Sequence, residues 1–343
     1  GYSSAASDVY KRQILASGDK NIDLISVNDE MISEFKHKGY LEPLEKNVMT
    51  EEVRDSFPQK YLESICEENG HIYSVPFQMD IMMFWVNQEL LKQAGLDEIK
   101  NTGDFDILQK SLKNPDQYAY GDAWENTHVY NSLSQFVNFW GGDYFDWTDP
   151  KTKDAARYMK SMLDEKNTSP AQFVDQYEQM EEKFIRGKYG CVFMYTSALG
   201  TFLDADVYGK NKIHMAPLPV LHKKKATNIA TWQYVLNNAS ENKDAAVRFL
   251  QYAAGYEGST EYAKIMKSYP ARVDVIENED IDLEGIDMIR KYLREYTLNA
   301  RPLCENSMGA VSDMGKLFQG YVLGQCEEDS FFEQAQNCIN TYY

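Results

Sequence analysis

The sequence predicts an α/β protein with two lobes, each a β-sheet flanked by helices. The chain has 343 residues, which is more than one ordinary hydrophobic core needs and enough for two. Short apolar runs with strand character alternate with segments of helical periodicity, a rhythm typical of α/β layers. No Pro-, Gly- or Ser-rich linker divides the chain, so several short crossovers between the lobes are expected, as in a hinged pair.

The first part of the chain carries the clearest strand–helix rhythm. Glycines and an Asn-Gly pair mark where helices end and where a hairpin turns. In chain order we expect a helix ending at Gly18, a strand over 22–27, a helix over 31–38 before Gly39, a turn at Asn69-Gly70, a strand over 71–76 and a helix over 88–94.

Helical periodicity dominates the rest of the chain. The predicted helices are 131–140, 150–166, 172–186, 242–254 and 282–296, and a helical tail covers 310–340. The predicted strands are 189–195, 214–217 and 231–236. No internal repeat or low-complexity tract interrupts this pattern.

Residues 1–13 are polar and lack the apolar centre of a signal peptide. We interpret them as a non-native or disordered leader that takes no part in the fold. No stretch is apolar enough to span a membrane, since the longest candidate, 75–86, is broken by Gln78 and Asp80.

Charge and cysteine content exclude several classes of function. The chain has 35 basic and 53 acidic residues, a net charge of -18, which disfavours nucleic acid as a partner. Its one tight basic run, 223–225, is interpreted as a solvated loop. The five cysteines are far apart and odd in number, which argues against a zinc ribbon or a disulfide framework. Cys191 lies in an apolar run typical of a buried thiol.

Motifs for catalysis, metals and cofactors are absent from the sequence. The five histidines are scattered without metal-ligand spacing, and there is no nucleophile elbow, Walker A loop or dinucleotide fingerprint. We therefore expect no metal, no cofactor and no enzyme activity. Paired carboxylates of a glycoside hydrolase are defined by their separation in space, so that class stays open as the main alternative of another kind.

Six segments, in order, carry a family resemblance. The sharpest is Tyr-Ser-Val-Pro-Phe-Gln-Met-Asp (73–80), which leads into Phe-Trp-Val-Asn-Gln-Glu-Leu-Leu-Lys-Gln-Ala-Gly (84–95). The others are 16–44, 141–146, 184–194, 215–246 and 269–272. Together they resemble the extracellular solute-binding proteins of family 1, the maltose-binding-protein-like group. Each motif alone is weak, but six in the right order are specific.

The resemblance implies a two-lobed fold of the periplasmic-binding-protein type (type II), with a hinge and an interlobe cleft. It implies an N-terminal lobe of 14–86 and 233–301, and a C-terminal lobe of 87–232 and 302–343. The first strand of the N-terminal lobe would be missing, as would a signal peptide, so the chain resembles an N-terminally truncated member.

The implied function is capture of a sugar or oligosaccharide and its delivery to the permease of a bacterial ABC importer. Such a protein is extracytoplasmic, as a cell-surface lipoprotein or in the periplasm, and we expect a monomer. A polyamine or a peptide bound by the same fold is the nearer alternative.

A sugar-binding site needs flat aromatic faces and planar polar groups that take two hydroxyls at once. Asp80 and Gln78 interrupt an apolar strand. Burying a lone carboxylate in such a run costs free energy unless a hydrogen-bonding or charged partner compensates it. Trp124 lies in a loop with no pattern that would bury it, so we expect it to be exposed. The expected ligand-binding residues are Asn28, Asp29, Gln78, Asp80, Trp85, Trp124, Tyr130, Asn131, Tyr195 and Trp232.

Three of these residues have a competing structural interpretation. Trp85 is equally compatible with core packing. Asn28 and Asp29 follow the first strand and are as well suited to capping the next helix as to touching a ligand.

The resemblance places Trp232 at the return crossing between lobes, and Tyr130, Asn131 and Tyr195 at element ends that face the cleft.

Overall fold

The computed structural model describes residues 4–343, which divide into two compact units. Unit 1 comprises the chain up to Asp80 together with Ile229–Arg290 and Leu303–Ser307, and unit 2 comprises Ile81–Asn228, Lys291–Pro302 and Met308–Tyr343. The lobe boundaries expected from the sequence, after residues 86, 232 and 301, stay predictions.

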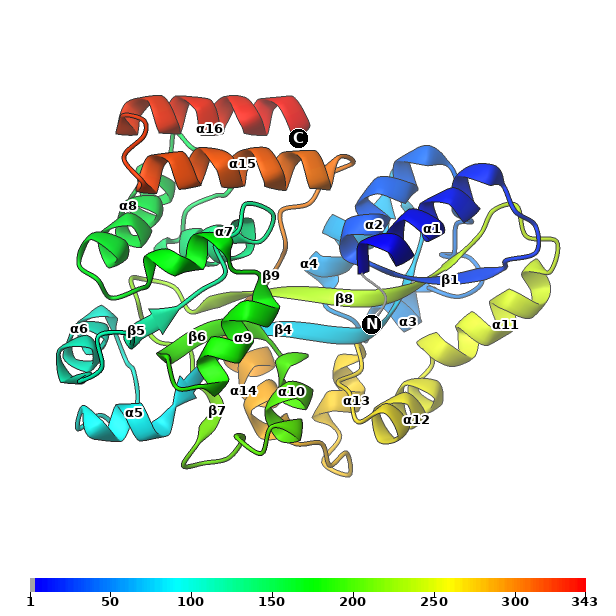
Figure 1. Cartoon of the computed structure of the whole chain (residues 1–343). Coiled ribbons are helices and arrows are strands. Elements are labelled where there is room, and N and C mark those ends of the chain that lie inside the picture. Colours follow the sequence, from blue (N-terminus) through cyan, green and yellow to red (C-terminus); the bar gives the residue numbers. More distant parts are fainter. Residues whose placement is uncertain (1–3) are drawn as a thin grey trace. The chain divides into compact units, whose positions relative to one another are not determined.

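Unit 1 contains a short sheet and small helices (Figure 1). Its elements are α1 (Ser4–Ser17), β1 (Leu24–Asn28), α2 (Asp29–Phe35), the 3-10 turn η1 (Lys36–Lys38), α3 (Glu51–Arg54), α4 (Gln59–Tyr61), the π-turn η2 (Leu62–Cys66), β2 (Glu67–Glu68), β3 (His71–Ile72), α11 (Lys243–Ala254), α12 (Tyr256–Met266) and α13 (Val273–Glu277). The strands β4 (Val75–Asn87) and β8 (Ala226–Leu236) each begin in one unit and end in the other.

The pairing of β1 with β8 positions the predicted residues of unit 1. The two strands are antiparallel, with Ile25 opposite Val235 and Asn28 opposite Trp232. Helix α2 follows β1 at once and buries Met31, Ile32 and Phe35. It passes through η1 and stops at Gly39, whose φ of 67° is the left-handed conformation that glycine adopts without strain.

The expectation of a disordered leader over 1–13 is wrong for residues 4–13, which are helical as part of α1. Residues 1–3 lie outside the described part of the chain. The helix ends before Gly18, as expected, with φ of 64°. Ile14 and Leu15 are buried, so the end of α1 packs on unit 1 and contributes to its core.

Unit 2 is the larger sheet-and-helix body. It contains α5 (Gln88–Gln93), α6 (Thr102–Ser111), β5 (Tyr118–Gly121), α7 (Val129–Trp140), α8 (Pro150–Asp164), the 3-10 segment η3 (Pro170–Val174), α9 (Tyr177–Ile185), β6 (Tyr189–Tyr195), α10 (Ala198–Asp204), β7 (Ile213–Ala216), β9 (Thr297–Ala300), α15 (Ser307–Val322) and α16 (Glu328–Tyr342). Helix α14 (Ile286–Glu295) begins in unit 1 and ends here.

The sheet of unit 2 is mixed. Strand β6 pairs in parallel with β5 and antiparallel with β4, and β7 pairs antiparallel with β4 on its other side. Every residue of β6 is buried, as expected for a central strand covered on both faces.

Helix α7 lies within the core of unit 2. Eleven of its twelve residues are buried, and its buried surface includes polar residues such as Asn131, Ser134 and Gln135 as well as aromatic rings. The rings of Phe136 and Phe139 lie 6.1 and 5.3 Å from that of Phe193 on β6. This packing determines where the first turn of α7 places its polar side chains.

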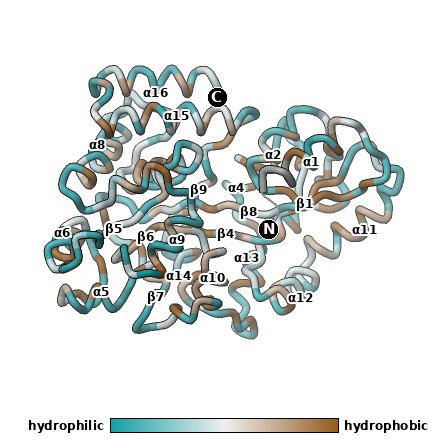
Figure 2. The backbone as a smooth tube through the Cα atoms, viewed as in Figure 1, coloured by the Kyte–Doolittle hydropathy of each residue, from teal (hydrophilic) through white to brown (hydrophobic). Residues whose placement is uncertain are grey.

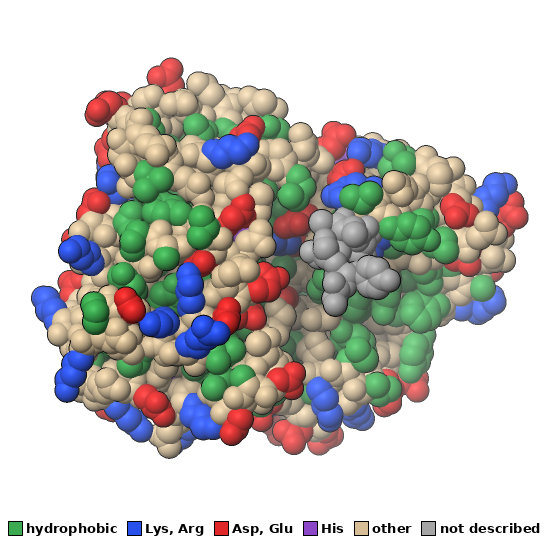
Figure 3. All heavy atoms as spheres, viewed as in Figure 1, with side chains coloured by type: hydrophobic (Ala, Val, Ile, Leu, Met, Phe, Trp, Pro, Cys, Tyr) green, Lys and Arg blue, Asp and Glu red, His purple; other side chains and the backbone are tan. Residues whose placement is uncertain are grey.

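The terminal helices α15 and α16 lie side by side in unit 2 (Figure 1). Along α16, buried residues recur at helical spacing, and hydrophobic and hydrophilic residues alternate (Figure 2). Within residues 4–343 no helix combines the length and apolar character needed to cross a membrane. Acidic and basic side chains are interspersed over the face shown in Figure 3.

Most predicted elements are present, with boundaries shifted by a few residues. Strand β6 coincides with the predicted 189–195, and α7, α8 and α11 lie within two residues of their predicted limits. The region 172–186 is not one helix but η3 followed by α9, because Asp175 and Gln176 are extended. The helices α3, α4, α6, α10, α12 and α13 and the strands β5 and β9 were not predicted from the sequence.

Candidate functional site

Four polar side chains of unit 2 form a group that we call the α7 cluster: Tyr130, Asn131, Tyr195 and Arg301. They come from the first turn of α7, the end of β6 and the residue after β9. The Tyr195 hydroxyl donates to Asn131 Oδ1 at 3.0 Å, and Arg301 Nη1 donates to the Tyr130 hydroxyl oxygen at 2.7 Å. Three residues predicted from separate segments of the sequence therefore lie together.

Buried amides hold α7 against the first residues of β8. Gln135 Nε2 donates to the Ala226 carbonyl oxygen at 2.8 Å, and its Oε1 accepts from the Asn228 backbone N–H at 3.0 Å. Asn228 Nδ2 in turn donates to Ser134 Oγ at 2.8 Å and to the Asn131 carbonyl oxygen at 3.2 Å. Satisfied buried networks of this kind rigidify their surroundings, so Asn131 has a fixed backbone position.

Asp122 anchors the segment before α7. Its carboxylate is fully buried and accepts from the Tyr120 hydroxyl at 2.6 Å, the Ser132 hydroxyl at 2.6 Å and the Trp124 indole N–H at 2.9 Å. The Ala123 backbone N–H donates to it as well, at 2.8 Å. Burial raises the pKa of this carboxyl above its ordinary value, and the hydrogen bonds oppose that shift.

The expectation that Trp124 is an exposed contact residue is wrong. Its side chain is fully buried, and its ring packs edge-on against Phe173 and Phe318 at centroid distances of 5.6 and 5.4 Å. The Asp122 carboxylate satisfies its indole N–H. Because these neighbours all belong to unit 2 and enclose the ring, we no longer assign Trp124 to the ligand.

The structure supports core packing for Trp85. The ring has no exposed surface and packs edge-on against Phe202, with centroids 5.0 Å apart. Its indole N–H donates to the Met194 carbonyl oxygen at 2.8 Å. A Trp with its polar group satisfied inside a sheet serves the core of unit 2.

Three half-buried side chains border the α7 cluster. The Tyr177 ring, at the start of α9, is edge-on to Tyr195 at 5.9 Å and to His128 at 5.3 Å. His128 Nδ1 lies 3.1 Å from Glu125 Oε2. Although partial burial opposes it, hydrogen bonds from Thr127 and His128 lower the pKa of Glu125, so this carboxylate is ionised at neutral pH.

In unit 1, Asn28 caps the next helix, whereas Asp29 is a buried residue of that helix. Asn28 Oδ1 accepts from the Met31 backbone N–H at 3.0 Å and so caps α2. Asp29, the first residue of α2, has no exposed surface.

The remaining predicted residues of unit 1 lie on β4 and β8. Gln78 is half-buried, and its Oε1 accepts from the Tyr262 hydroxyl at 2.8 Å. Asp80 is 8% exposed. Trp232 is 37% exposed, and Lys11 Nζ lies 5.3 Å from the centre of its ring. Trp232 is therefore the one predicted aromatic residue whose ring the structure leaves substantially open.

The chemistry of these groups suits hydroxyl-rich ligands. The α7 cluster combines a guanidinium, an amide and two phenols, which between them donate and accept several hydrogen bonds in fixed geometry. Within residues 4–343, no three His, Cys, Asp or Glu side chains are placed to hold a metal ion. Tyr130, Asn131 and Tyr195 are only 1%, 3% and 7% exposed, so their contact with a ligand stays a prediction.

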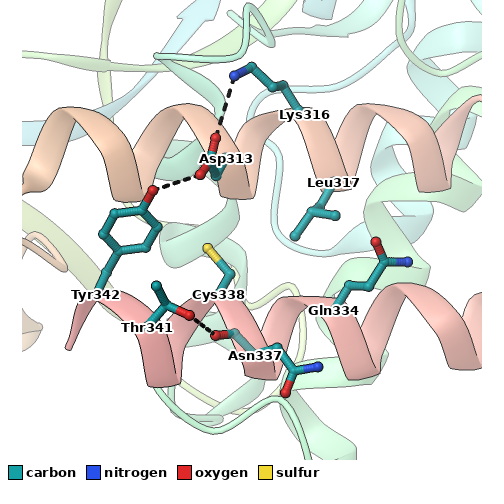
Figure 4. A pocket seen from close by; sticks show the side chains of 8 residues that line it. All are labelled: Asp313, Lys316, Leu317, Gln334, Asn337, Cys338, Thr341 and Tyr342. Atoms are coloured by element: carbon teal, nitrogen blue, oxygen red, sulfur yellow. Dashed lines mark hydrogen bonds and ion pairs between the residues drawn. The ribbon is translucent and has the colours of Figure 1, made fainter.

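A separate hollow of about 470 Å³ lies between α15 and α16 (Figure 4). Asp313 stands at its edge and accepts from the Tyr342 hydroxyl at 2.7 Å and from Lys316 Nζ at 3.4 Å. None of the predicted residues lines it. The bond between Tyr342 and Asp313 joins the two helices across it, so we assign it to helix packing.

Sequence reasoning missed Arg301, Tyr177 and Asp122. Tyr177 heads a helix as Tyr130 does, so the same signal could have identified it. Asp122 lies two residues from both Tyr120 and Trp124. Burying a carboxylate among aromatic side chains costs free energy unless hydrogen-bond donors surround it. Arg301 is brought to Tyr130 only by the tertiary fold, and no local pattern marks it.

The chain is similar to known proteins in sequence and in fold. The sequence model of a family described as bacterial extracellular solute-binding protein matches residues 2–260, which is more than half of the chain. The probable amino-acid ABC transporter periplasmic-binding protein of Sinorhizobium fredii is 24% identical over 239 residues. The arabinooligosaccharide-binding protein of Bacillus subtilis is 22% identical over 282 residues.

These alignments cover 66% and 78% of this chain, but 54% and 64% of the two relatives, so the chain spans less than two thirds of their length. A solved ABC transporter solute-binding protein from Thermotoga lettingae, bound with α-D-tagatose, superposes with a TM-score of 0.81. It is 18% identical, and the match covers 98% of this chain and 89% of that chain. This likeness confirms the predicted α/β fold of the periplasmic-binding-protein type.

Proposed function

Because the chain belongs to the family of bacterial extracellular solute-binding proteins, we propose that it captures a sugar or oligosaccharide and delivers it to an ABC transporter. It acts outside the cytoplasm, as a monomer, and releases its ligand chemically unchanged. The arabinooligosaccharide-binding relative and the tagatose-bound structural neighbour support a carbohydrate as the ligand class.

The observation that carries this proposal is the α7 cluster. Tyr195 donates to Asn131, and Arg301 donates to Tyr130, so the four side chains form two hydrogen-bonded pairs that share the first turn of α7. Planar amide and guanidinium groups beside aromatic rings are the combination that recognises both the hydroxyls and the C–H faces of a sugar. Preorganised donors reduce the entropy lost when the ligand binds.

Trp232 of unit 1 supplies the second element of recognition. Its ring is open enough to stack on a sugar, whereas the rings of Trp85 and Trp124 are enclosed. We propose that Trp232 and Asp80 are ligand contacts of unit 1.

The test is a thermal-shift titration of the intact chain with arabino-oligosaccharides, D-tagatose and maltose. A ligand that binds only the folded state stabilises it by RT ln(1 + [L]/Kd), about 2.7 kcal/mol at a hundredfold excess over Kd. The Trp232→Ala variant should melt like the parent without sugar, because the ring is exposed, but should lose most of the sugar-induced stabilisation.

Phe145→Ala is the matched control, because Phe145 is an aromatic residue of unit 2 with 43% exposure and no place among the proposed contacts. It should keep the full sugar response. Amino acids, polyamines and short peptides are the competing ligands, and the amino-acid-binding relative makes the first of these the sharpest comparison. Stabilisation by amino acids alone would overturn the carbohydrate assignment. Release of reducing sugar would indicate a hydrolase.

A further inference from the structure

Unit 1 contains a pocket that none of the predicted ligand-binding residues lines. It measures about 220 Å³ and lies where β4 and β8 meet α11 and α12. Five of its lining residues are aromatic: Phe77, Tyr234, Phe249, Tyr252 and Tyr262. All of them belong to unit 1, so the pocket is complete within that unit.

The back wall of this pocket is rigid. Phe77 and Tyr234 are stacked with ring centres 4.1 Å apart, and the Tyr262 ring stands edge-on to Phe77 at 5.4 Å. The Tyr262 hydroxyl donates to Gln78 Oε1 at 2.8 Å, which fixes that ring in turn. The wall is therefore preformed, as small-molecule sites usually are.

The rim of the pocket is open and apolar. Tyr252 is 50% exposed and Ile265 is 73% exposed, and Phe249 beside them is 45% exposed. Figure 3 shows hydrophobic side chains gathered on the surface over α11 and α12. Apolar surface concentrated around a pocket is typical of a binding site rather than of chance exposure.

We propose that this pocket binds a single sugar ring as an accessory site, independent of the ligand held by the α7 cluster. Its volume lies below the roughly 300–1,000 Å³ of sites for drug-sized ligands, which leaves room for one small ring. Three of the five aromatic residues are tyrosines, so the lining offers hydroxyls as well as flat faces. The Tyr262 hydroxyl is already bonded to Gln78 Oε1, so the hydroxyls left for a ligand are those of Tyr234 and Tyr252.

Polar groups at the same rim complete the match to a sugar. The Glu261 carboxylate lines the pocket, is exposed, and lies 3.8 Å from Lys264 Nζ, so it accepts ligand hydroxyls without being sequestered. Ser259, which is 5% exposed, lines the pocket, and its hydroxyl donates to the Ala253 carbonyl oxygen at 3.2 Å, which leaves its lone pairs to accept from a ligand. Aromatic faces with a carboxylate at the edge are the combination that stacks on a ring and accepts its hydroxyls.

The test uses the intact chain with ¹³C-labelled isoleucine methyl groups. Ile265 lines the pocket, and its methyl resonance is identified by its loss in Ile265→Val. Ile107, 47% exposed in unit 2, is the internal control. Titration with L-arabinose or D-tagatose should move the Ile265 resonance in a saturable way and leave Ile107 in place. Cyclohexanol, which has an apolar ring and a single hydroxyl, serves as the probe for a predominantly apolar site.

Three variants separate this site from the proposed function. Tyr252→Ala should abolish the Ile265 response, whereas Phe145→Ala and Trp232→Ala should keep it. Loss of the response in Trp232→Ala would overturn the independence of the site. A response to cyclohexanol but to neither sugar would overturn the sugar assignment. Because the thermal-shift titration reports the main ligand, failure there and failure here are distinguishable.

Discussion

The two sets of residues proposed for the ligand differ in how they are held. In unit 2, the side chains of the α7 cluster bond to one another, and a buried network behind them fixes the helix. In unit 1, Trp232 projects from a strand with 37% of its surface exposed, and Asp80 lies separately on β4. Tyr130, Asn131 and Tyr195 of the first set are buried in their unit, whereas Trp232 of the second set is substantially exposed.

This difference predicts different consequences of substitution. A change in the α7 cluster alters both stability and ligand affinity, because the same hydrogen bonds serve both. A change at Trp232 alters affinity alone, because few contacts of the folded unit depend on an exposed ring. Ligand specificity should therefore change more readily through unit 1 than through unit 2.

The largest expected effect is that of Trp124→Ala. Removing a fully buried Trp leaves a cavity between Phe173 and Phe318, and should lower the free energy of unfolding by about 3–5 kcal/mol. Asp122 would also lose its indole donor. Urea denaturation followed by circular dichroism measures the change.

Trp232→Ala is the control for Trp124→Ala, with an expected loss below about 1 kcal/mol. Equal losses for the two variants would break the contrast between the units. Such a result would mean that the Trp232 side chain contributes as much to the stability of unit 1 as the Trp124 side chain contributes to that of unit 2.

A smaller effect is expected for Tyr195→Phe. The substitution removes the hydroxyl that donates to Asn131 Oδ1 and leaves that oxygen, in a residue only 3% exposed, without this donor. We expect a loss of about 1–2 kcal/mol in stability and about a tenfold loss of sugar affinity, equivalent to about 1.4 kcal/mol. Calorimetric titration with the sugar that shifts the parent protein measures the second quantity.

Tyr343→Phe is the matched control for Tyr195→Phe. Its hydroxyl donates to the Pro302 carbonyl oxygen at 2.7 Å, but the residue is 43% exposed. Water replaces the lost bond there, so stability and affinity should both stay near those of the parent. If Tyr195→Phe behaved in the same way, the α7 cluster would have no role in binding.

The elements that could be predicted from the sequence are those with a clear local pattern of hydrophobic residues. Strand β6 and helix α7 are strongly apolar, and both were located to within two residues. Strand β5 spans only four residues, Tyr118–Gly121, and is specified by pairing with β6 rather than by its own pattern. Helix α12 begins directly after Gly255, so its start looked like the end of α11.

For the candidate site, the sequence indicated which residues lie at the ends of helices and strands, but not whether each side chain is buried or exposed. Tyr130, Asn131 and Tyr195 stand at element ends, where side chains converge, and the structure brings them together. Trp124 was judged exposed because its loop has no periodicity, yet tertiary packing with Phe318 of α15, almost two hundred residues away in the chain, buries it. Burial by distant segments leaves no trace in a local pattern.

The smallest effect is expected outside both regions, at Glu328 in unit 2. Arg157 donates to its Oε1 through Nε at 3.0 Å and Nη2 at 2.6 Å, and the Tyr321 hydroxyl donates to Oε2 at 3.0 Å. The bond from Arg157 lowers the pKa of Glu328 below its ordinary 4.5, and slight burial opposes the shift. A lowered pKa means that the ion pair stabilises the fold above that ordinary value and ceases to do so as the pH falls through the folded-state pKa.

Glu328→Gln should therefore lower the free energy of unfolding at neutral pH by less than about 1 kcal/mol, because both partners are about 40% exposed and water screens the pair. The difference from the parent should shrink as the pH falls below 4.5 and vanish below the folded-state pKa, and it should also shrink in high salt. Denaturation at neutral and acidic pH measures it. A loss as large as that of Tyr195→Phe would mean that the exposed surface of unit 2 is as critical as its buried α7 cluster, and the contrast between buried and exposed contacts would fail.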